Sequence, residues 1–230
     1  MSQQAVLYLK AGRQRSVNQR HPWVFSGAVE RLQGQPQPGE TVEVRSAEGE
    51  LLGSAAFSPS SKIQARFWSF DAHEPINPYF FRQRLSKALA RRAGLVSDET
   101  NAVRLVHAES DGLPGFIVDR YADWLVVQIL SAGAEFWKEV LLDGLVELSG
   151  IANVYERSDV EVRRLEGLLE KRGVVRGGEI PGKVLVRENE LQFLVDIEMG
   201  QKTGFYIDQR PNRSKVREVA RGKRVLNCSC

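Results

Sequence analysis

The sequence predicts a mixed fold in three parts: a small N-terminal β-barrel, a central α+β domain, and the first helix and strand of a doubly wound α/β domain. Three observations support this division. Short alternating apolar runs between turn residues dominate the first part. Helical and strand patterns then mix along the chain, and finally a basic helical segment leads into a short apolar run. We place the three parts at residues 1–84, 85–198 and 199–230.

The N-terminal part carries four strand candidates with turn signals at close spacing between them. Several short strands joined by tight turns are typical of a small barrel. Gly53 lies inside one candidate, which indicates a bulge or a close approach of two backbones. The candidates span residues 5–9, 41–45, 51–57 and 62–68.

The central part follows a linker at residues 71–78, where the composition changes. Apolar residues at helical spacing predict helices over 79–93 and 133–148. Apolar runs predict strands between and after them, and the last two are joined by a three-residue turn as a hairpin. The predicted strands span residues 103–107, 116–120, 124–130, 151–156, 184–187 and 191–196.

Composition excludes several classes of protein. No apolar run approaches the roughly 18 residues that a membrane helix needs, and residues 1–4 show no signal-peptide pattern. Both cysteines, Cys228 and Cys230, lie at the C-terminal end, so a disulfide scaffold is excluded for the body of the chain. Two such ligands with only three histidines elsewhere make a poor zinc site. We expect a cytoplasmic protein with no metal and no membrane partner.

Charge is distributed unevenly although the net charge is only +3. Residues 1–29 contain four basic side chains and no acidic one, and residues 202–224 contain eight basic against two acidic ones. Basic ends around an acidic centre suggest a polyanionic partner. Solvated surface charge explains the same pattern, so charge leaves both interpretations open.

An aromatic run at residues 20–29 follows the acid-free stretch. Arginines beside aromatic rings suit RNA, because the cations contact phosphates while the rings stack on unpaired bases. Alternatively Trp23 and Phe25 belong to the barrel core, and we expect Phe25 to be buried. We assign RNA binding to Arg13, Arg15, Arg20 and Trp23.

Two further polar runs have competing interpretations. Glu109 and Asp111 form a carboxylate pair, but the glycines and proline of residues 109–115 favour a rigid turn over acid–base chemistry. The charged residues at 155–159 follow a buried strand, where α/β proteins place ligands. Internal salt bridges explain that second run equally well.

The run at residues 200–210 carries the clearest ligand signal. Gly200 and Gly204 bracket a loop that is able to approach a ligand closely, and Phe205 offers a flat surface. Asp208 is a candidate helix cap. The following helix then repeats arginine at spacings of three and four, as a stripe that faces either phosphate or an acidic domain. The stripe consists of Arg210, Arg213, Arg217 and Arg221.

These runs together resemble the bacterial 23S rRNA cytosine-C5 methyltransferases that carry an N-terminal PUA domain. The resemblance extends over the whole chain, and the run at 201–210 is its most specific part. It implies a PUA-like RNA-binding barrel, a central α+β domain and the start of a Rossmann-like domain that binds S-adenosylmethionine. It assigns cofactor contacts to Gln201, Lys202, Thr203, Phe205, Asp208 and Arg210.

The resemblance also implies that the catalytic cysteine lies beyond Cys230, so no catalytic residue is assigned. Cys228 ends the apolar run predicted as a strand, at 224–228, and is not the nucleophile. In the family a glycine-rich turn follows this strand, whereas here the sequence reads Ser229-Cys230. We therefore expect the N-terminal portion of such an enzyme, inactive alone and of doubtful cofactor affinity. A stand-alone PUA-type RNA-binding module and an inert truncation product remain the alternatives.

Overall fold

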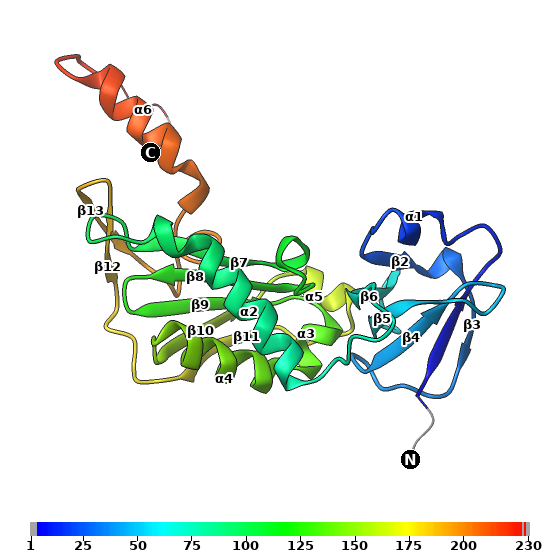
Figure 1. Ribbon diagram of the computed structural model, residues 1–230. Helices are drawn as coiled ribbons and strands as arrows, with labels where there is room; N and C mark the ends of the chain where they lie inside the picture. Colours follow the sequence, from blue (N-terminus) through cyan, green and yellow to red (C-terminus); the bar gives the residue numbers. More distant parts are fainter. Residues whose placement is uncertain (1–3, 227, 229–230) are drawn as a thin grey trace.

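The computed structural model describes residues 4–226 and 228. Six strands near the N-terminus form a sheet that curls around its own apolar core (Figure 1). The sheet order is β2-β6-β5-β4-β1-β3, in which β1 runs parallel to β4 and the other neighbours are antiparallel. These strands are β1 (Val6–Leu9), β2 (Trp23–Phe25), β3 (Val29–Gln33), β4 (Thr41–Arg45), β5 (Leu51–Phe57) and β6 (Ile63–Ser69).

Alternation explains why these segments form strands around a core. In β4 the side chains of Val42 and Val44 are fully buried, while the residues between them are partly exposed. Gly53 confirms the expected close backbone approach, because a Cβ at this position would lie 2.3 Å from the carbonyl oxygen of Ser69. A short helix α1 (Arg15–Asn18) and the 3-10 turn η1 (Ser26–Ala28) flank β2. The N-terminal part is therefore all-β apart from two short turns of helix.

The central domain is a five-stranded sheet of order β11-β10-β9-β8-β7, in which only β9 and β10 run parallel. Helices α2 (Pro78–Arg92) and α4 (Lys138–Ser149) pack together on one face (Figure 1). The strands are β7 (Ala102–His107), β8 (Phe116–Tyr121), β9 (Trp124–Ile129), β10 (Asn153–Ser158) and β11 (Lys171–Arg176). The smaller helical segments are η2 (Ala93–Leu95), η3 (Ala108–Asp111), α3 (Ala132–Phe136) and α5 (Val162–Leu165).

The predicted hairpin, β12 (Val184–Glu188) and β13 (Leu191–Val195), packs on part of the opposite face of this sheet and shares an apolar cluster with it. Strand β9 shows the consequence in its sequence. Leu125 and Val127 face the helices, whereas Trp124 and Val126 face the hairpin cluster. A strand buried on both faces is apolar at nearly every position.

The boundary predicted at residue 84 falls inside a continuous helix. Helix α2 spans 78–92, and its residues Phe80, Phe81 and Leu85 belong to the core shared with the central sheet. Asn77 caps this helix by accepting a hydrogen bond from the Phe80 N–H at 3.0 Å. The break between the two domains therefore lies in the 71–77 linker.

The barrel is attached to the central domain by apolar and ionic contacts. Ala56 and Trp68 of the barrel belong to the same core as α2. The buried Glu166 carboxylate pairs with the Arg66 guanidinium at 2.8 Å and accepts a hydrogen bond from the Ser58 hydroxyl at 3.0 Å. Because both partners are buried, this pair fixes the position of the barrel on the sheet.

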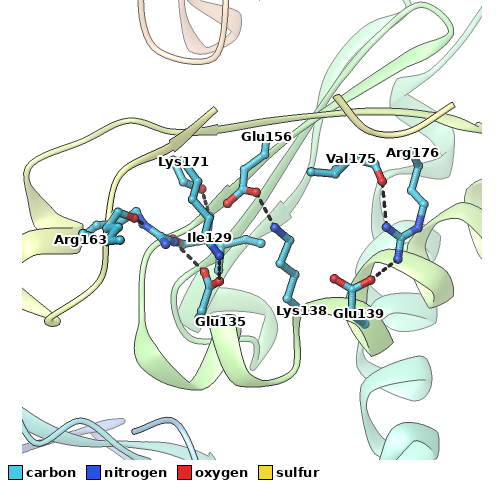
Figure 2. A network of polar contacts seen from close by, with 11 residues as sticks. Ile129, Glu135, Lys138, Glu139, Glu156, Arg163, Lys171, Val175 and Arg176 are labelled. Atoms are coloured by element: carbon cyan, nitrogen blue, oxygen red, sulfur yellow. Dashed lines mark hydrogen bonds and ion pairs between the residues drawn. The ribbon is translucent and has the colours of Figure 1, made fainter. Parts of the chain in front are cut away.

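A second polar network lies at the end of the central sheet nearest the barrel, around α3 and α5 (Figure 2). The fully buried Arg163 donates to the backbone oxygens of Ile129 and Leu169 and pairs with Glu135. Lys171 pairs with the same carboxylate. Burial by itself would raise the pKa of Glu135, but hydrogen bonds from Lys171 and Arg163 outweigh it and hold that pKa below its ordinary value.

The C-terminal segment confirms the predicted helix but not the predicted strand. The 3-10 turn η4 (Ile207–Gln209) leads into α6 (Arg210–Ala220), which projects from the body of the molecule (Figure 1). Residues 224–226 form no strand and have no ladder partner among the described residues, and Val225 and Leu226 are exposed. A strand needs a neighbour to accept its hydrogen bonds. Asn227, within the predicted strand, lies outside the described residues.

Candidate functional site

The first candidate site is a hollow at one end of the barrel, beside α1. Its volume is about 470 Å³. Arg13 and Arg15, two of the arginines assigned to RNA from the sequence, line it and are exposed. We call it the barrel hollow. Its lining residues are Gly12, Arg13, Arg15, Ser16, Gln19, Phe25, Gly27 and Ala28.

Phe25 is not the core residue that the sequence suggested. Its side chain is 49% exposed and lines the barrel hollow. The reason is its place in the strand. The register of β2 against β6 shifts between Val24 and Phe25, and the chain then turns into η1. The side chain therefore leaves the face that buries Val24.

Arg20 and Trp23 lie outside the barrel hollow. Arg20 has a positive φ of 62° and stands over the ring of Phe70 at 5.3 Å. It lines a separate cleft of about 360 Å³ where the barrel meets the central domain. The half-buried Trp23 donates its indole N–H to the Glu109 carboxylate at 2.8 Å, so this ring also joins the two domains. The structure thus brings Arg13 and Arg15 together and separates them from Arg20 and Trp23.

The second candidate site is a pocket of about 420 Å³ beside the loop at 200–210. Three of the six predicted cofactor residues line it: Lys202, Phe205 and Asp208. Strand β7 supplies Arg104 and His107 to the same pocket, and Ile207 completes the lining. We call it the loop pocket. It combines cationic groups, one carboxylate and an aromatic ring.

Thr203, predicted to contact a cofactor, is instead buried and anchors the loop. Its hydroxyl donates to the Asp119 carboxylate at 2.6 Å and lies 2.8 Å from the Tyr121 hydroxyl. Arg104 holds the same carboxylate with two hydrogen bonds of 2.8 and 2.9 Å. Burial and the neighbouring Asp119 raise the pKa of Tyr121, so its phenol remains protonated. The hydrogen bonds with Asp119 raise the pKa of Arg104.

The loop's shape also depends on Gly200. A Cβ here would lie 2.3 Å from the Asp196 carbonyl oxygen and 2.4 Å from that of Gly204, so only glycine fits. Arg157 donates to the carbonyl oxygens of Ile197 and Gly200 at 3.1 and 3.0 Å. Arg157 of the charged run at 155–159 therefore holds this loop, whereas Glu156 of the same run forms an ion pair with Lys138 of α4 at 2.7 Å. Of its two interpretations, the structure supports the internal contacts.

Gln201 and Arg210, the remaining predicted cofactor residues, do not line the loop pocket. The exposed Gln201 accepts a hydrogen bond from the Tyr206 hydroxyl. Arg210 donates to the carbonyl oxygen of Ala102 and lies 3.6 Å from the Glu188 carboxylate. Asp208 does not cap α6, which has no side-chain cap.

Three arginines of the α6 stripe contact acidic side chains at the turn end of the hairpin, although Arg217 also remains exposed. Arg213 binds both carboxylate oxygens of the buried Glu188, at 2.7 and 2.6 Å. Arg217 pairs with Glu190 at 3.4 Å. Of the two interpretations of the stripe, docking on an acidic element therefore accounts for Arg210, Arg213 and Arg217.

The carboxylate pair at 109–115 is also structural. Asp111 pairs with Arg92 at 2.8 Å and Arg91 at 3.3 Å, and it accepts from the backbone N–H of His107 at 2.7 Å. Burial would raise the pKa of Asp111, but the contacts with Arg92 and the His107 amide lower it below its ordinary value. A carboxylate held ionised in this way serves the turn and not proton transfer.

Sequence reasoning missed Arg104, His107 and the exposure of Phe25. Arg104 and His107 lie in a strand that the sequence identifies only by its apolar residues. The loop that they approach follows about a hundred residues later in the chain, and only the folded sheet brings the two segments together.

Within the described residues, no helix combines the length and apolar character that a membrane crossing requires. The same residues contain no group of three or more His, Cys, Asp or Glu side chains placed to hold a metal.

Comparison with solved structures defines the fold first. A Streptococcus mutans protein assigned as a SAM-dependent methyltransferase superposes with a TM-score of 0.74 at 19% identity, covering 92% of this chain and 53% of that one. A second structure, of an assigned methyltransferase complexed with SAH, gives a TM-score of 0.77 at 18% identity over the same shares of both chains. At these identities the likeness shows the fold. Residues 7–70 match the family model of the PUA-like domain.

Sequence relatives are more specific. The chain is 48% identical over 223 residues to the ribosomal RNA large subunit methyltransferase I of Aliivibrio fischeri, covering 96% of this chain and 56% of that protein. It is 49% identical over 228 residues to the protein of the same name from Aeromonas hydrophila, covering 98% of this chain and 57% of the relative. The chain thus spans little more than half the length of these relatives.

Proposed function

We propose that this chain is the RNA-recognising portion of an S-adenosylmethionine-dependent methyltransferase that acts on cytosine C5 of 23S rRNA, and that it supplies one wall of the cofactor pocket. The observation that carries the proposal is the 48% identity over 96% of the chain to a ribosomal RNA large subunit methyltransferase I. The resemblance of the run at 201–210 favours the cytosine target.

The barrel supplies the proposed RNA contacts. Arg13 and Arg15 stand at the barrel hollow, and Arg20 stands at the cleft between the domains. None of the three has an ion-pair partner among the described residues, whereas most arginines of the central domain are paired. Guanidinium groups that are exposed and not already neutralised are the ones that bind phosphate. Trp23 acts in this proposal by fixing the barrel against Glu109.

The loop pocket supplies the proposed cofactor contacts. S-adenosylmethionine carries a carboxylate, an ammonium group, ribose hydroxyls and a flat adenine, and when bound it supplies an electrophilic methyl group. Lys202, His107 and Asp208 line the pocket, and in this proposal the first two bind the carboxylate and Asp208 binds hydroxyl or ammonium groups. Phe205 lines the pocket with only part of its ring free, because Arg213 stands over one face at 4.3 Å and the Phe193 ring packs beside it at 5.1 Å. Thr203, Gln201 and Arg210 hold the loop in shape around this pocket.

We further propose that methyl transfer requires residues that follow position 230 in the longer relatives. On this proposal the 230-residue chain binds RNA in the cytoplasm and binds the cofactor weakly, and it does not methylate RNA. The nucleophilic cysteine belongs to that later part, and Cys228, which is exposed, has no catalytic role.

The cofactor assignment is tested by heteronuclear NMR of the isotope-labelled chain titrated with S-adenosylmethionine. We expect amide shifts confined to the neighbourhood of Lys202, Phe205 and Asp208, and their loss in Lys202→Met. Lys215→Met, which changes an exposed lysine of α6, serves as the matched control and should shift like wild type. Shifts elsewhere, or none at millimolar cofactor, would contradict the assignment and leave an RNA-binding module as the function.

A further inference from the structure

The barrel hollow contains an exposed phenylalanine that the fold does not require. Phe25 is 49% exposed at the end of a strand whose preceding residue, Val24, is buried. Leaving an aromatic ring in water forgoes the free energy that its burial would contribute. An exposed ring in a hollow therefore points to a ligand with its own flat apolar face.

The charge of the hollow restricts what that ligand is. Arg13 and Arg15 line it, and none of the described residues that line it is acidic. Two lysines stand close by. Lys10 donates to the Gly27 carbonyl at 3.1 Å, and the backbone oxygen of the exposed Lys62 accepts from the Ser26 N–H at 2.9 Å. The cleft between the domains differs, because Asp71, Glu74 and Glu109 line it beside its cations.

The size and remaining lining fit one nucleotide. A volume of about 470 Å³ lies at the lower end of the range for small-ligand sites. Ser16 and Gln19 place a hydroxyl and an amide in the same hollow. These groups both donate and accept hydrogen bonds, as the edge of a base requires. The hollow thus presents a ring for the base face, polar groups for its edge and guanidinium groups for the flanking phosphates.

A row of aromatic rings extends from Phe25 along the strand. Trp23 lies 6.3 Å from Phe25 and His21 lies 5.7 Å from Trp23, each pair edge to face. Arg20 follows at the far end of this row, at the interdomain cleft. The cations and rings therefore follow one path from the barrel hollow toward the central domain.

We propose that the barrel hollow is a binding site for an unpaired base of single-stranded RNA, with Phe25 as the stacking surface and Arg13 and Arg15 on the adjoining phosphates. The inference rests on the RNA-binding function proposed above and specifies which form of RNA the barrel recognises. In a duplex the base faces are covered by their neighbours, so only an unpaired base reaches the ring.

The test measures fluorescence anisotropy of the 230-residue chain with a labelled twelve-nucleotide single-stranded RNA and with the same RNA in a duplex. Wild type should bind the single strand more tightly. Phe25→Leu keeps an apolar side chain but removes the ring, and should weaken single-strand binding about 5- to 100-fold. Phe25→Tyr keeps the ring and should bind like wild type.

Phe136→Leu is the matched control, because Phe136 is 48% exposed and does not line the barrel hollow. It should leave binding unchanged. Wild-type binding that is equal for both RNA forms and insensitive to Phe25→Leu would overturn the inference and leave the proposed RNA function intact. Failure of wild type to bind either RNA would instead overturn RNA binding by this chain altogether, and the inference with it.

Discussion

Replacing Thr203 with valine removes one hydroxyl from the centre of the loop anchor while keeping the shape of the side chain. In the structure that hydroxyl donates to the Asp119 carboxylate at 2.6 Å and contacts the Tyr121 hydroxyl at 2.8 Å. Thr203 and Asp119 are each 1% exposed, and Tyr121 is fully buried. Water therefore does not replace the lost partner.

The magnitude follows from these two contacts. A hydrogen bond to a charged group contributes about 1.5 to 3 kcal/mol, and one between neutral groups about 0.5 to 1.5 kcal/mol. Asp119 keeps its two hydrogen bonds from Arg104, and Tyr121 keeps a long contact of 3.4 Å to the Phe205 carbonyl. We therefore expect Thr203→Val to lower the free energy of opening the loop by about 2 to 4 kcal/mol.

Hydrogen exchange of the Gly200 and Gly204 amides, which bond within the loop, measures this free energy. A loss of about 3 kcal/mol corresponds to exchange roughly a hundredfold faster. Thr41→Val is the matched control, since the buried Thr41 hydroxyl has no hydrogen-bond partner among the described residues. Its removal should be neutral or slightly stabilising. Equal effects of the two substitutions on loop exchange would refute the anchor.

Three further outcomes are expected. Glu166→Ala should lower the free energy of unfolding, measured in urea, by about 3 to 5 kcal/mol, because it leaves Arg66 buried without its close partner. The control Glu170→Ala, which breaks an exposed pair with Arg164, should lower it by about 1 kcal/mol or less. Similar losses for the two variants would contradict the role of the Glu166–Arg66 pair in joining the domains. Since the pKa of Glu135 is lowered on folding, its contribution is present above the ordinary value of 4.5 and is lost as the pH falls through the folded value. Glu135→Gln should therefore reduce the loss of unfolding free energy between neutral pH and about pH 3. Urea unfolding at each pH measures this loss. The same pH dependence in wild type and variant would contradict the contribution assigned to the Glu135 carboxylate. Arg213→Ala should speed amide hydrogen exchange along α6, because it removes the contact of the helix with Glu188. Lys215→Ala, which breaks an exposed pair with Glu218, should not change that exchange. Unaltered exchange in both variants would show that the arginine stripe does not hold α6 against the hairpin.

The sequence predicted those elements whose pattern is local. Strand β9 is apolar throughout, and the hairpin alternates around a short turn, so both are recognisable within a few residues. Strand β11 escaped detection because Gly173 and three basic residues interrupt its pattern, and it is held by pairing with β10. The strand predicted near residue 225 shows the converse, since an apolar run without a neighbouring strand does not form a ladder.

Only those site residues whose type and immediate neighbours are distinctive could be predicted from the sequence. Arg13 and Arg15 stand out in an acid-free stretch, and both line the barrel hollow. The two glycines around Thr203 suggest a ligand contact, but the hydrogen-bond partners of its hydroxyl, Asp119 and Tyr121, belong to β8, more than eighty residues earlier. Phe25 reads as a core residue, and only the shift in strand register exposes it. Long-range pairing decides all of these positions, and sequence spacing does not contain it.

Filter binding of the chain to a 23S rRNA fragment across a salt series tests the central claim most directly. Each phosphate contact contributes a slope of about 0.7 in the logarithm of affinity against the logarithm of salt for single strands. Replacing Arg13, Arg15 and Arg20 together by alanine should lower affinity and reduce the slope by about 2. Replacing Arg82, Lys87 and Arg164, three exposed cations of the central domain, should change neither. Equal affinity and slope for wild type and the Arg13, Arg15 and Arg20 variant would contradict RNA recognition by the barrel.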